Sequence, residues 1–415
     1  MPRVFFPWLF VFFLLLLDWY VFQALKTISG HWSLRTTRWV YMIYWTVCLL
    51  SVGFFLSLIF VGFESWHKLL RTYLFAGIIG LFIAKFISGL FFLVDDIRRL
   101  FQYAGSSWVP HWQKEVQNGG ISRSAFISWM GFITGGSLFT TLLYGFGNKY
   151  KYTLKNIRLT FDNLPKSFQG FRIIHISDIH SGSFTDMNAV KRGIDLINQQ
   201  KADLILFTGD LVNQRADEMD PFVEMFSSLR ATLGVYATLG NHDYGFPKRG
   251  DEDIRQQHFQ NAAAVEAVHQ RMGWNLLRNN HIILEKNQEK MALIGVENIS
   301  AKSGFPSYGN LKPAIEGTEN IPFKILMSHD PSHWNAEITA SYPDIDLTLS
   351  GHTHGMQFGV EIPGFRWSPV KYIYKQWAGL YAEKNQKLYV NRGFGFIGYP
   401  GRVGILPEIT LIELG

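Results

Sequence analysis

Residues 171–180 read FRIIHISDIH, an apolar run that ends in Asp178 and His180. Isoleucine and phenylalanine favour extended backbone, and a continuous apolar run predicts a strand that is buried on both faces. Four later segments repeat this pattern, with Asp, Asn or His after an apolar run: DLILFTGD (203–210), GVYATLGNHD (234–243), KILMSHD (324–330) and DLTLSGHTH (346–354). The sequence therefore predicts five strands that each carry polar side chains at one end.

Polar amphipathic segments separate these predicted strands. Residues 188–198, 217–230 and 252–271 predict helices, whereas residues 282–285 and 291–295 predict a hairpin. This alternation is typical of an α/β domain, in which ligands collect beyond the carboxyl ends of the strands. Glycines stand directly before three of the polar residues, which predicts close packing where a side chain would clash: Gly209, Gly240 and Gly351.

The first 147 residues have a different character. Four apolar segments, at 4–22, 40–63, 73–94 and 125–146, have about the 20 residues that a membrane-spanning helix needs. No small-x-small cleavage site follows the first segment, so we expect a retained helix rather than a signal peptide. We therefore predict a four-helix transmembrane N-terminal region (residues 1–147) followed by an α/β domain (residues 148–415).

Two ionisable residues, Asp18 and Lys85, lie inside the first and third apolar segments. One interpretation places Asp18 near a helix end and lets the long Lys85 side chain reach the membrane surface. In the alternative, the two helices run in the same direction and the residues lie at similar depth. Asp18 and Lys85 would then pair and neutralise each other, which lowers the cost of burying either charge.

Charge and cysteine content exclude some classes of function. The formal charge of +6 is spread over Lys and Arg residues that alternate with acids, so we expect contact with lipid headgroups and no nucleic-acid partner. Cys48 is the single cysteine, which excludes an intramolecular disulfide and a Cys-based zinc site. The basic residues that flank the apolar segments divide evenly between the two faces of the membrane, so they leave the side of the α/β domain open.

The polar strand-end residues predict a metal site when they are taken together. A lone Asp after a strand usually caps a turn, and a lone His is usually structural. Mixed Asp, Asn and His side chains, however, suit divalent ions such as Mn, Fe, Zn, Ni or Mg, and the lack of thiolates argues against a structural zinc site. Other histidines lie outside the pattern and are expected to be structural: His175, His281 and His333.

In order along the chain, these blocks resemble the signature of the calcineurin-like metallophosphoesterases: Asp178-x-His180, Gly209-Asp210, Gly240-Asn241-His242-Asp243, His329 and Gly351-His352-Thr353-His354. The resemblance covers about residues 152–415 and implies a four-layer αββα sandwich. The four apolar segments and the run GHTHGMQFG (351–359) are similar to the transmembrane subgroup of this family, some of whose members hydrolyse the pyrophosphate of UDP-2,3-diacylglucosamine, a lipid A precursor.

The resemblance also implies roles for individual residues. Asp178, His180 and His354 would bind one divalent ion, Asp210 would bridge two ions, and the second ion would be held by three further residues: Asn241, His329 and His352. A water between the ions would be the nucleophile. His242 would act on the substrate phosphate as cation or acid, and Asp243 would orient His242 or a metal ligand.

Arg392 follows a strand-like LYV run and is a candidate substrate-binding residue that would clamp a second phosphate. The alternative is a loop arginine that is held in a salt bridge. Residues 355–381 predict either a packed loop with an ordinary aromatic core or a segment that lies at the membrane interface. Apolar and mostly aromatic residues alternate there with cations: Met356, Phe358, Phe365, Trp367, Tyr372, Tyr374, Trp377 and Tyr381, with Arg366, Lys371 and Lys375.

These observations favour a membrane-anchored phosphoesterase that hydrolyses a phosphodiester or pyrophosphate bond of a lipid-linked substrate. We expect a multi-pass protein of a cell membrane, the inner membrane of a bacterium. Two alternatives remain open. One is a phosphatase or phosphodiesterase that acts on soluble nucleotides or other phosphoesters. The other is a non-enzymatic membrane sensor with a regulatory metal domain.

Overall fold

The computed structural model describes residues 2–61, 65–106, 122–246 and 253–415. Two predicted helix ends, Phe63 and Glu252, lie outside these residues. The chain forms two compact units, residues 1–144 and residues 145–415, where the sequence suggested a boundary after residue 147.

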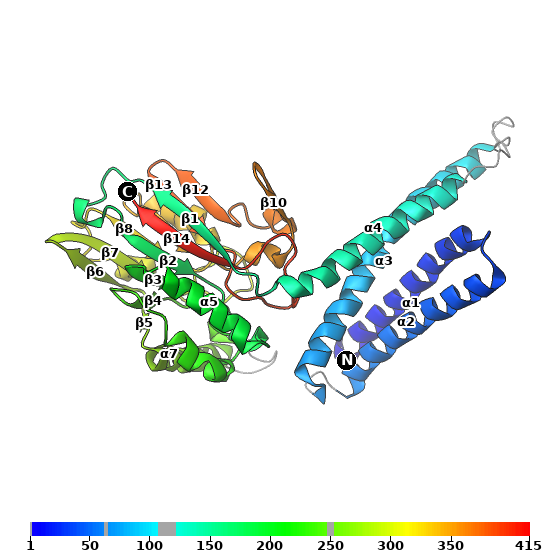
Figure 1. Ribbon diagram of the computed structural model, residues 1–415, viewed down its shortest axis with the longest axis horizontal. Coiled ribbons are helices and arrows are strands. Elements are labelled where there is room, and N and C mark those ends of the chain that lie inside the picture. The colour runs from blue at the N-terminus through cyan, green and yellow to red at the C-terminus, as the bar shows by residue number, and fades with distance from the viewer. Residues whose placement is uncertain (1, 62–64, 107–121, 247–252) are drawn as a thin grey trace. The chain divides into compact units, whose positions relative to one another are not determined.

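The N-terminal unit consists of four long apolar helices, as predicted: α1 (Pro2–Ser29), α2 (Leu34–Phe60), α3 (Lys68–Ser106) and α4 (Arg123–Gly145) (Figure 1). All four have the length and composition to cross a membrane. With its 39 residues, α3 extends about 58 Å at 1.5 Å per residue. It is therefore longer than the roughly 30 Å hydrocarbon core of a bilayer requires. Its charged residues Asp95, Asp96, Arg98 and Arg99 follow the apolar segment.

Asp18 and Lys85 form the predicted ion pair between α1 and α3. Lys85 Nζ lies 2.6 Å from Asp18 Oδ1, and both side chains are almost fully buried. The same ammonium lies 3.2 Å from Cys48 Sγ of α2 and 5.1 Å from the centre of the Tyr44 ring. The hydroxyl of Tyr44 donates a hydrogen bond to the backbone oxygen of Asp18 at 2.7 Å. Three helices therefore meet at one neutralised cluster, which confirms the pairing hypothesis over the separate placement of the two charges.

The second unit contains two mixed six-stranded sheets. The first sheet has the order β1 (Thr153–Leu159), β14 (Glu408–Leu414), β2 (Arg172–Ile176), β3 (Leu204–Phe207), β4 (Val235–Ala237), β5 (Asn275–Leu276). The second has the order β12 (Gly379–Glu383), β13 (Gln386–Val390), β9 (Leu347–Ser350), β8 (Lys324–Met327), β7 (Glu289–Gly295), β6 (Asn280–Lys286). All five predicted strands and the predicted hairpin are therefore present.

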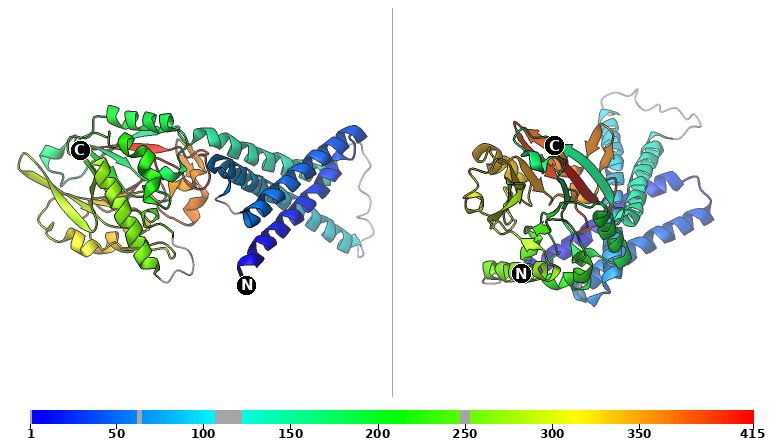
Figure 2. Two further views of the ribbon diagram at one scale, coloured as in Figure 1. Left: turned by 90° about the horizontal axis from the view of Figure 1, so that it is seen from below. Right: turned by 60° about the vertical axis from the view of Figure 1, so that its left-hand side comes forward.

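Three apolar layers hold this unit together. Along β3, Leu204 and Leu206 point to a core between the sheets, whereas Ile205 and Phe207 point to a core under the helices. The helix side is covered by α5 (Met187–Gln199), α6 (Val223–Phe226) and α7 (Ile254–Met272). Beyond the second sheet, a third core includes Trp334 and residues of α8 (Leu311–Ile315). The result is the expected αββα sandwich, and it explains the continuous apolar runs (Figures 1 and 2).

The segment at 217–230 differs from the predicted long helix. It forms a 3₁₀ segment, η6 (Ala216–Phe222), which is followed by the single turn of α6. Pro221 lies within this segment and has no N–H to donate, so a continuous α-helix is interrupted there. The other two predicted helices correspond to α5 and α7.

Candidate metal centre

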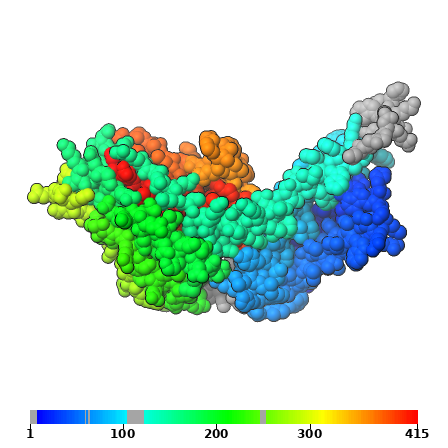
Figure 3. Space-filling model, viewed as in Figure 1, coloured from blue at the N-terminus to red at the C-terminus, as the bar shows by residue number. Residues whose placement is uncertain are grey.

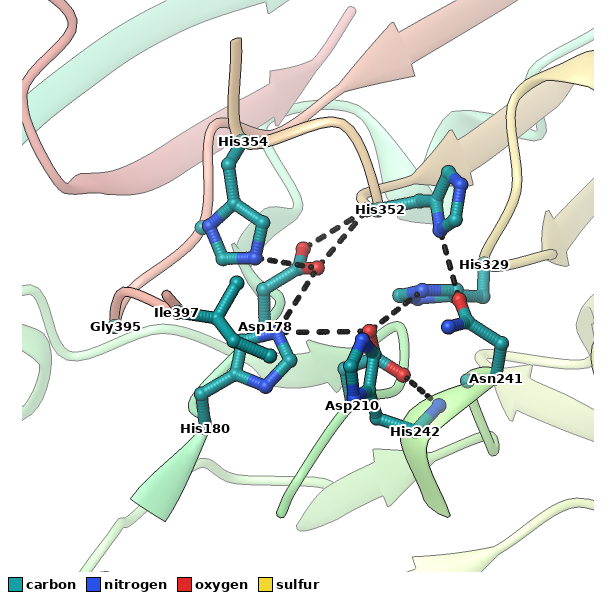
Figure 4. Close-up of polar contacts among 12 residues, drawn as sticks. Asp178, His180, Asp210, Asn241, His242, His329, His352, His354, Gly395 and Ile397 are labelled. Carbon is teal, nitrogen blue, oxygen red and sulfur yellow. Dashed lines mark hydrogen bonds and ion pairs between the residues drawn. The ribbon is translucent and has the colours of Figure 1, made fainter. Parts of the chain in front are cut away.

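The carboxyl ends of five strands bring the seven predicted metal ligands together. Asp178 and His180 follow β2, Asp210 follows β3, and Asn241 follows β4, all in the first sheet. The ligands from the second sheet follow β8 and β9: His329, His352 and His354. The two sheets therefore contribute to one cluster at a shared edge, and its side chains point toward one another (Figure 4). Six of the seven are less than 6% exposed, so water is largely excluded from their ligand atoms.

The cluster has two halves that meet at Asp210. In one half, His354 Nε2 lies 3.3 Å from Asp178 Oδ1, and His180 Nε2 lies 3.6 Å from Asp210 Oδ2. In the other half, His329 Nε2 lies 3.1 Å from the same oxygen of Asp210. Three groups of ligand atoms, each within 4.8 Å of one another, follow from this arrangement: Asp178 with His180 and His354, His180 with Asp210 and His242, and Asp210 with His329 and His352.

The imidazole nitrogens that face this centre fit a metal ion. Among the residues that the structure describes, Nε2 of His180, His329 and His354 is buried and has no hydrogen-bond partner. An unpaired buried polar atom is costly, so a cluster of such atoms around two carboxylates requires a compensating ligand. Divalent cations accept this mixture of nitrogen and oxygen donors. The donor set therefore fits the divalent metals that the sequence predicted, without determining which metal is bound.

Five of the candidate ligands have left-handed backbone, which L side chains seldom adopt. Their φ angles lie between 48° and 70°: Asp178, His180, Asp210, His352 and His354. Such conformations cost about 1 kcal/mol or more for each residue and persist where the surrounding structure enforces them. Their concentration on the candidate ligands, in the turns after β2, β3 and β9, marks this edge of the sheets as a candidate functional site.

Glycine allows backbone and carboxylates to approach closely at this edge, between the sheets at Gly351 and within the first sheet at Gly240. A Cβ at Gly351 would overlap Ser177 Oγ and the carboxylate of Asp178, and a Cβ at Gly240 would overlap the carboxylate of Asp210. Both glycines stand directly before a candidate ligand in the sequence. The close approach of backbone to carboxylate therefore explains why no side chain is present at these positions.

Asp243 fixes the turn that carries Asp210. Its Oδ2 accepts hydrogen bonds from the backbone N–H of Asp210 at 2.9 Å and of Gly240 at 2.8 Å. Its Oδ1 accepts a third bond from the N–H of Leu211 at 2.8 Å. With a longer bond from the N–H of Val212, this buried carboxylate accepts from four N–H groups and joins the β3 and β4 turns, so Asp243 supports the Asp210 turn directly.

His242 lies beside the cluster and is held by the backbone. Its ring Nδ1 donates to the carbonyl oxygen of Asn213 at 2.8 Å, and its backbone N–H donates to Asp210 Oδ1 at 2.8 Å. The His242 ring packs edge-on against the His180 ring, with centres 4.8 Å apart. The Nδ1 contact leaves Nε2 of His242 free for a proton or a ligand.

Sequence reasoning missed three groups that orient the candidate ligands. The Nδ1 of His329 donates to the carbonyl oxygen of Thr208 at 2.6 Å, so its Nε2 faces Asp210. The hydroxyl of Tyr374 lies 2.7 Å from His352 Nε2, while His352 Nδ1 lies 2.8 Å from Asn241 Oδ1. Arg402 is fully buried, and its Nη2 lies 3.2 Å from Nδ1 of His354. Tyr374 and Arg402 are distant in sequence from their partners and belong to no strand-end motif, so only the fold reveals them.

The electrostatics of the cluster favour cation binding. Burial lowers the pKa of His180 to about 3, so its imidazole is neutral and can offer a lone pair. Burial alone would raise the pKa of Asp210, but the adjacent His329 and His242 hold it well below its usual value. For His329, burial acts to lower the pKa, yet the Asp210 carboxylate outweighs it and raises the pKa to about 10. A bound cation would take the place of the proton on His329.

Arg392 lies outside the cluster and is buried in ion pairs. Its guanidinium contacts Glu408, and its Nη2 lies 2.8 Å from Glu361 Oε1. The structure therefore shows the salt-bridged alternative, and a phosphate contact would require Arg392 to exchange one of these carboxylates. The off-motif histidines have structural contacts instead: His175 with Thr208, His281 with the carbonyl of Ala314, and His333 with Ser328 and Glu337.

Comparison with known protein families agrees with this geometry. Residues 171–356 match the model for the calcineurin-like phosphoesterases. Residues 2–148 match the model described as a probable calcineurin-like phosphoesterase transmembrane domain. The first match contains all seven candidate ligands, and the second contains all four long helices.

Among curated proteins, the chain is 29% identical over 266 residues to the transmembrane protein with metallophosphoesterase domain of Danio rerio. That alignment covers 62% of the chain and 56% of the relative, so the chain spans about half the length of this relative. It is 29% identical to the phosphodiesterase YaeI of Escherichia coli (59% of the chain, 82% of the relative). It is 27% identical to the UDP-2,3-diacylglucosamine pyrophosphatase LpxG of Chlamydia muridarum (58% and 84%). The chain belongs to the calcineurin-like phosphoesterases and carries the transmembrane domain of that family at its N-terminus.

Proposed function

We propose that this chain is a membrane-anchored hydrolase that cleaves a phosphodiester or pyrophosphate bond at a centre for two divalent metal ions. The observation that carries the proposal is the buried cluster in which Asp210 contacts both His180 and His329. One carboxylate shared by two sets of donors matches a pair of ions better than a single ion.

The proposal assigns each ligand to one half of the cluster. Asp178, His180 and His354 would hold the first ion, Asp210 would bridge, and the second ion would be held by Asn241, His329 and His352. When bound, the ions supply Lewis-acid activation of water and neutralise charge on the phosphoryl oxygens.

Two further residues would act without holding an ion. His242, whose Nδ1 is held by Asn213, would present Nε2 to the phosphate as a hydrogen-bond donor or as the acid for the leaving oxygen. Asp243 would keep the bridging carboxylate in position through its contact with the Asp210 N–H.

A lipid-linked phosphoester, such as UDP-2,3-diacylglucosamine, is the substrate class that we favour. The four helices are long and apolar enough to cross a membrane, and they would hold the chain where an acylated substrate is concentrated. The similarity to the LpxG pyrophosphatase supports the same class. We accordingly propose the inner membrane of a bacterium as the location of the protein.

Hydrolysis is tested with the full chain in detergent micelles, first stripped of metal by chelation and then supplied with Mn²⁺. A bis-aryl phosphate should be cleaved only after Mn²⁺ addition, and Asp210→Asn should lose this activity. The matched control is His281→Gln, because His281 bonds to a backbone carbonyl outside the cluster. If the wild-type protein binds Mn²⁺ but hydrolyses no phosphoester, the proposed hydrolase activity is wrong and the non-enzymatic sensor remains as the alternative.

The substrate class is tested separately with one head group in two forms. UDP-2,3-diacylglucosamine should show a much higher kcat/KM than its deacylated form. Equal values for the two, or faster turnover of soluble nucleotides, would contradict the lipid assignment and leave the hydrolase itself intact.

A further inference from the structure

The hairpin formed by β10 (Val360–Ile362) and β11 (Phe365–Trp367) has its polar and apolar faces reversed relative to a normal surface hairpin. Cross-strand partners share a face, and the register pairs Val360 with Trp367, Glu361 with Arg366, and Ile362 with Phe365. One face is therefore entirely apolar, and the other holds both charged residues. The turn between the strands is Pro363-Gly364, with Gly364 at φ 79°, which is typical of a tight type II turn.

The charged face of the hairpin contacts the rest of the domain through the half-buried Glu361 and the exposed Arg366. Glu361 Oε1 lies 2.8 Å from Arg392 and 3.5 Å from Lys155. The guanidinium of Arg366 stacks over Trp377 and Tyr381, with centres 5.3 and 5.4 Å away. These contacts fix which side of the hairpin faces inward, so the opposite side must face outward.

The apolar face is exposed. Val360, Ile362 and Phe365 are 43%, 58% and 54% exposed, and the adjoining Tyr372 and Ile373 are 75% and 53% exposed. Soluble surfaces seldom expose this many neighbouring large apolar residues unless a partner covers them. The space-filling view shows this orange segment as a raised part of the domain surface (Figure 3).

Charge around the exposed face favours a lipid surface as the partner. From Ile362 to Ala382 the sequence contains no acidic residue and, besides Arg366 of the inward face, two exposed lysines, Lys371 and Lys375. Lys371 Nζ lies 5.2 Å from the centre of the exposed Tyr372 ring, and the Tyr372 hydroxyl contacts Trp367 Nε1 at 3.5 Å. Aromatic and aliphatic side chains flanked by lysines are the composition that segments at the headgroup level of a bilayer use.

The hairpin is also connected to the first residue of its own unit, Gly145. Helix α4 ends at Gly145, whose carbonyl accepts a hydrogen bond from the N–H of Arg402 at 3.0 Å. The next residue, Val403, pairs with Gln357 and Gly359, and β10 begins directly after Gly359. Two steps of backbone pairing therefore lead from Gly145, where the second unit begins, to the base of the hairpin.

From these observations we propose that the apolar face of the β10–β11 hairpin, with Tyr372 and Ile373, inserts into the headgroup region of an anionic lipid bilayer. This is a second membrane contact, separate from the four helices. At its base, Ser368 Oγ donates to the carbonyl of Gly355 at 2.8 Å, next to the candidate ligand His354. Insertion of the hairpin would thus link the bilayer surface to the loop that carries His354. The proposed insertion does not depend on the proposed hydrolysis.

The test measures the depth of single labels in the full chain, reconstituted in vesicles of zwitterionic and anionic phospholipids. In a Cys48→Ala background, Ile362→Cys or Phe365→Cys carries an environment-sensitive fluorophore. Asn385→Cys, exposed in the β12–β13 turn, is the matched control. Labels at 362 and 365 should shift to the blue and lose most of their emission to lipids with quenchers on the acyl chains, whereas the label at 385 should keep its emission.

Two results would overturn the proposal. In the first, labels at 362 and 365 respond to the quenching lipids as the label at 385 does, which would place the hairpin in water. In the second, the blue shift occurs without quenching by lipid and disappears on dilution with unlabelled chain, which would indicate a contact between two copies. Because two positions are labelled independently, poor folding of one variant leaves the test intact.

Discussion

Two buried ionic clusters, one in each unit of the molecule, are built in opposite ways. In the helical unit, Lys85 Nζ contacts both Asp18 and Cys48, so the positive charge has partners for its protons. In the α/β unit, the carboxylates of Asp178 and Asp210 face imidazole nitrogens that have no hydrogen-bond partner among the described residues. The first cluster is complete as it stands, whereas in the second the neutral imidazoles of His180 and His354 have unused lone pairs. Unused lone pairs distinguish a binding site from a structural ion pair, although both clusters are buried and charged.

The largest expected effect tests the incomplete cluster. Asp210→Asn removes the shared carboxylate, and we expect kcat to fall by about 10³-fold or more, as when one member of a catalytic unit is removed. Metal content per chain, measured on the purified protein, should fall at the same time because both halves lose a ligand. Unchanged metal content and rate would show that Asp210 does not join the two halves.

Substitutions in the complete cluster should change the stability of the helical unit rather than the activity. Asp18→Asn or Lys85→Met leaves one uncompensated charge or polar group among apolar helices, and we expect each to destabilise the helical unit by about 3–5 kcal/mol. The double variant should recover most of this loss. Measurement requires reversible unfolding of the chain in mixed micelles. If both single variants are as stable as wild type, the ion pair contributes nothing to the fold.

His269 belongs to neither cluster, and burial is the main cause of its pKa shift. Its ring is fully buried and bonds to the carbonyl of Val265, and burial lowers its pKa from 6.5 to about 4. The folded chain keeps His269 neutral while the unfolded chain binds a proton below pH 6.5. Protonation of His269 therefore does not affect the free energy of unfolding above pH 6.5. As the pH falls from 6.5 toward 4, it lowers the free energy of unfolding by up to about 1.4 kcal/mol per pH unit. His269→Gln should flatten this part of the stability–pH curve for the α/β unit.

The smallest expected effect concerns the support of the incomplete cluster. Tyr374→Phe removes the hydroxyl that lies 2.7 Å from His352 Nε2, and we expect metal affinity to fall about tenfold, as for other groups that orient a ligand. Tyr372→Phe is the matched control, since Tyr372 is exposed and contacts Trp367. Isothermal titration of the metal-free protein compares the two. Equal affinities would assign Tyr374 a packing role only.

The sequence predicted the strands and the position of every candidate ligand because a buried strand and its polar end are both local features. FRIIHI predicts β2 by composition, and Asp178 follows it directly. The pairing of Asp18 with Lys85 was also predictable, since helical rise converts sequence position into depth. The sandwich layers followed from family resemblance rather than from composition.

Other features depend on register and on distant contacts. Tyr374 and Arg402 contact candidate ligands from loops whose path is decided by packing, and Glu361 of β10 contacts Arg392, so no spacing rule identifies these residues. The reversed hairpin could not be read from its composition, because a shift of one residue in register would exchange its faces. Residues 217–230 were predicted as one helix from their polarity, and Pro221 divides the segment.

The left-handed turns under the candidate ligands restrict which residues evolution can recruit there. Asp, Asn and His adopt this backbone several times more often than most side chains, while β-branched residues are strongly disfavoured. At the positions of His180, His352 and His354, substitution is therefore limited by the dihedral angles before any metal is considered. A lineage could exchange oxygen and nitrogen donors among these three residue types with little change in the turns. The backbone conformation of these turns therefore limits which donor residues can occur at this centre.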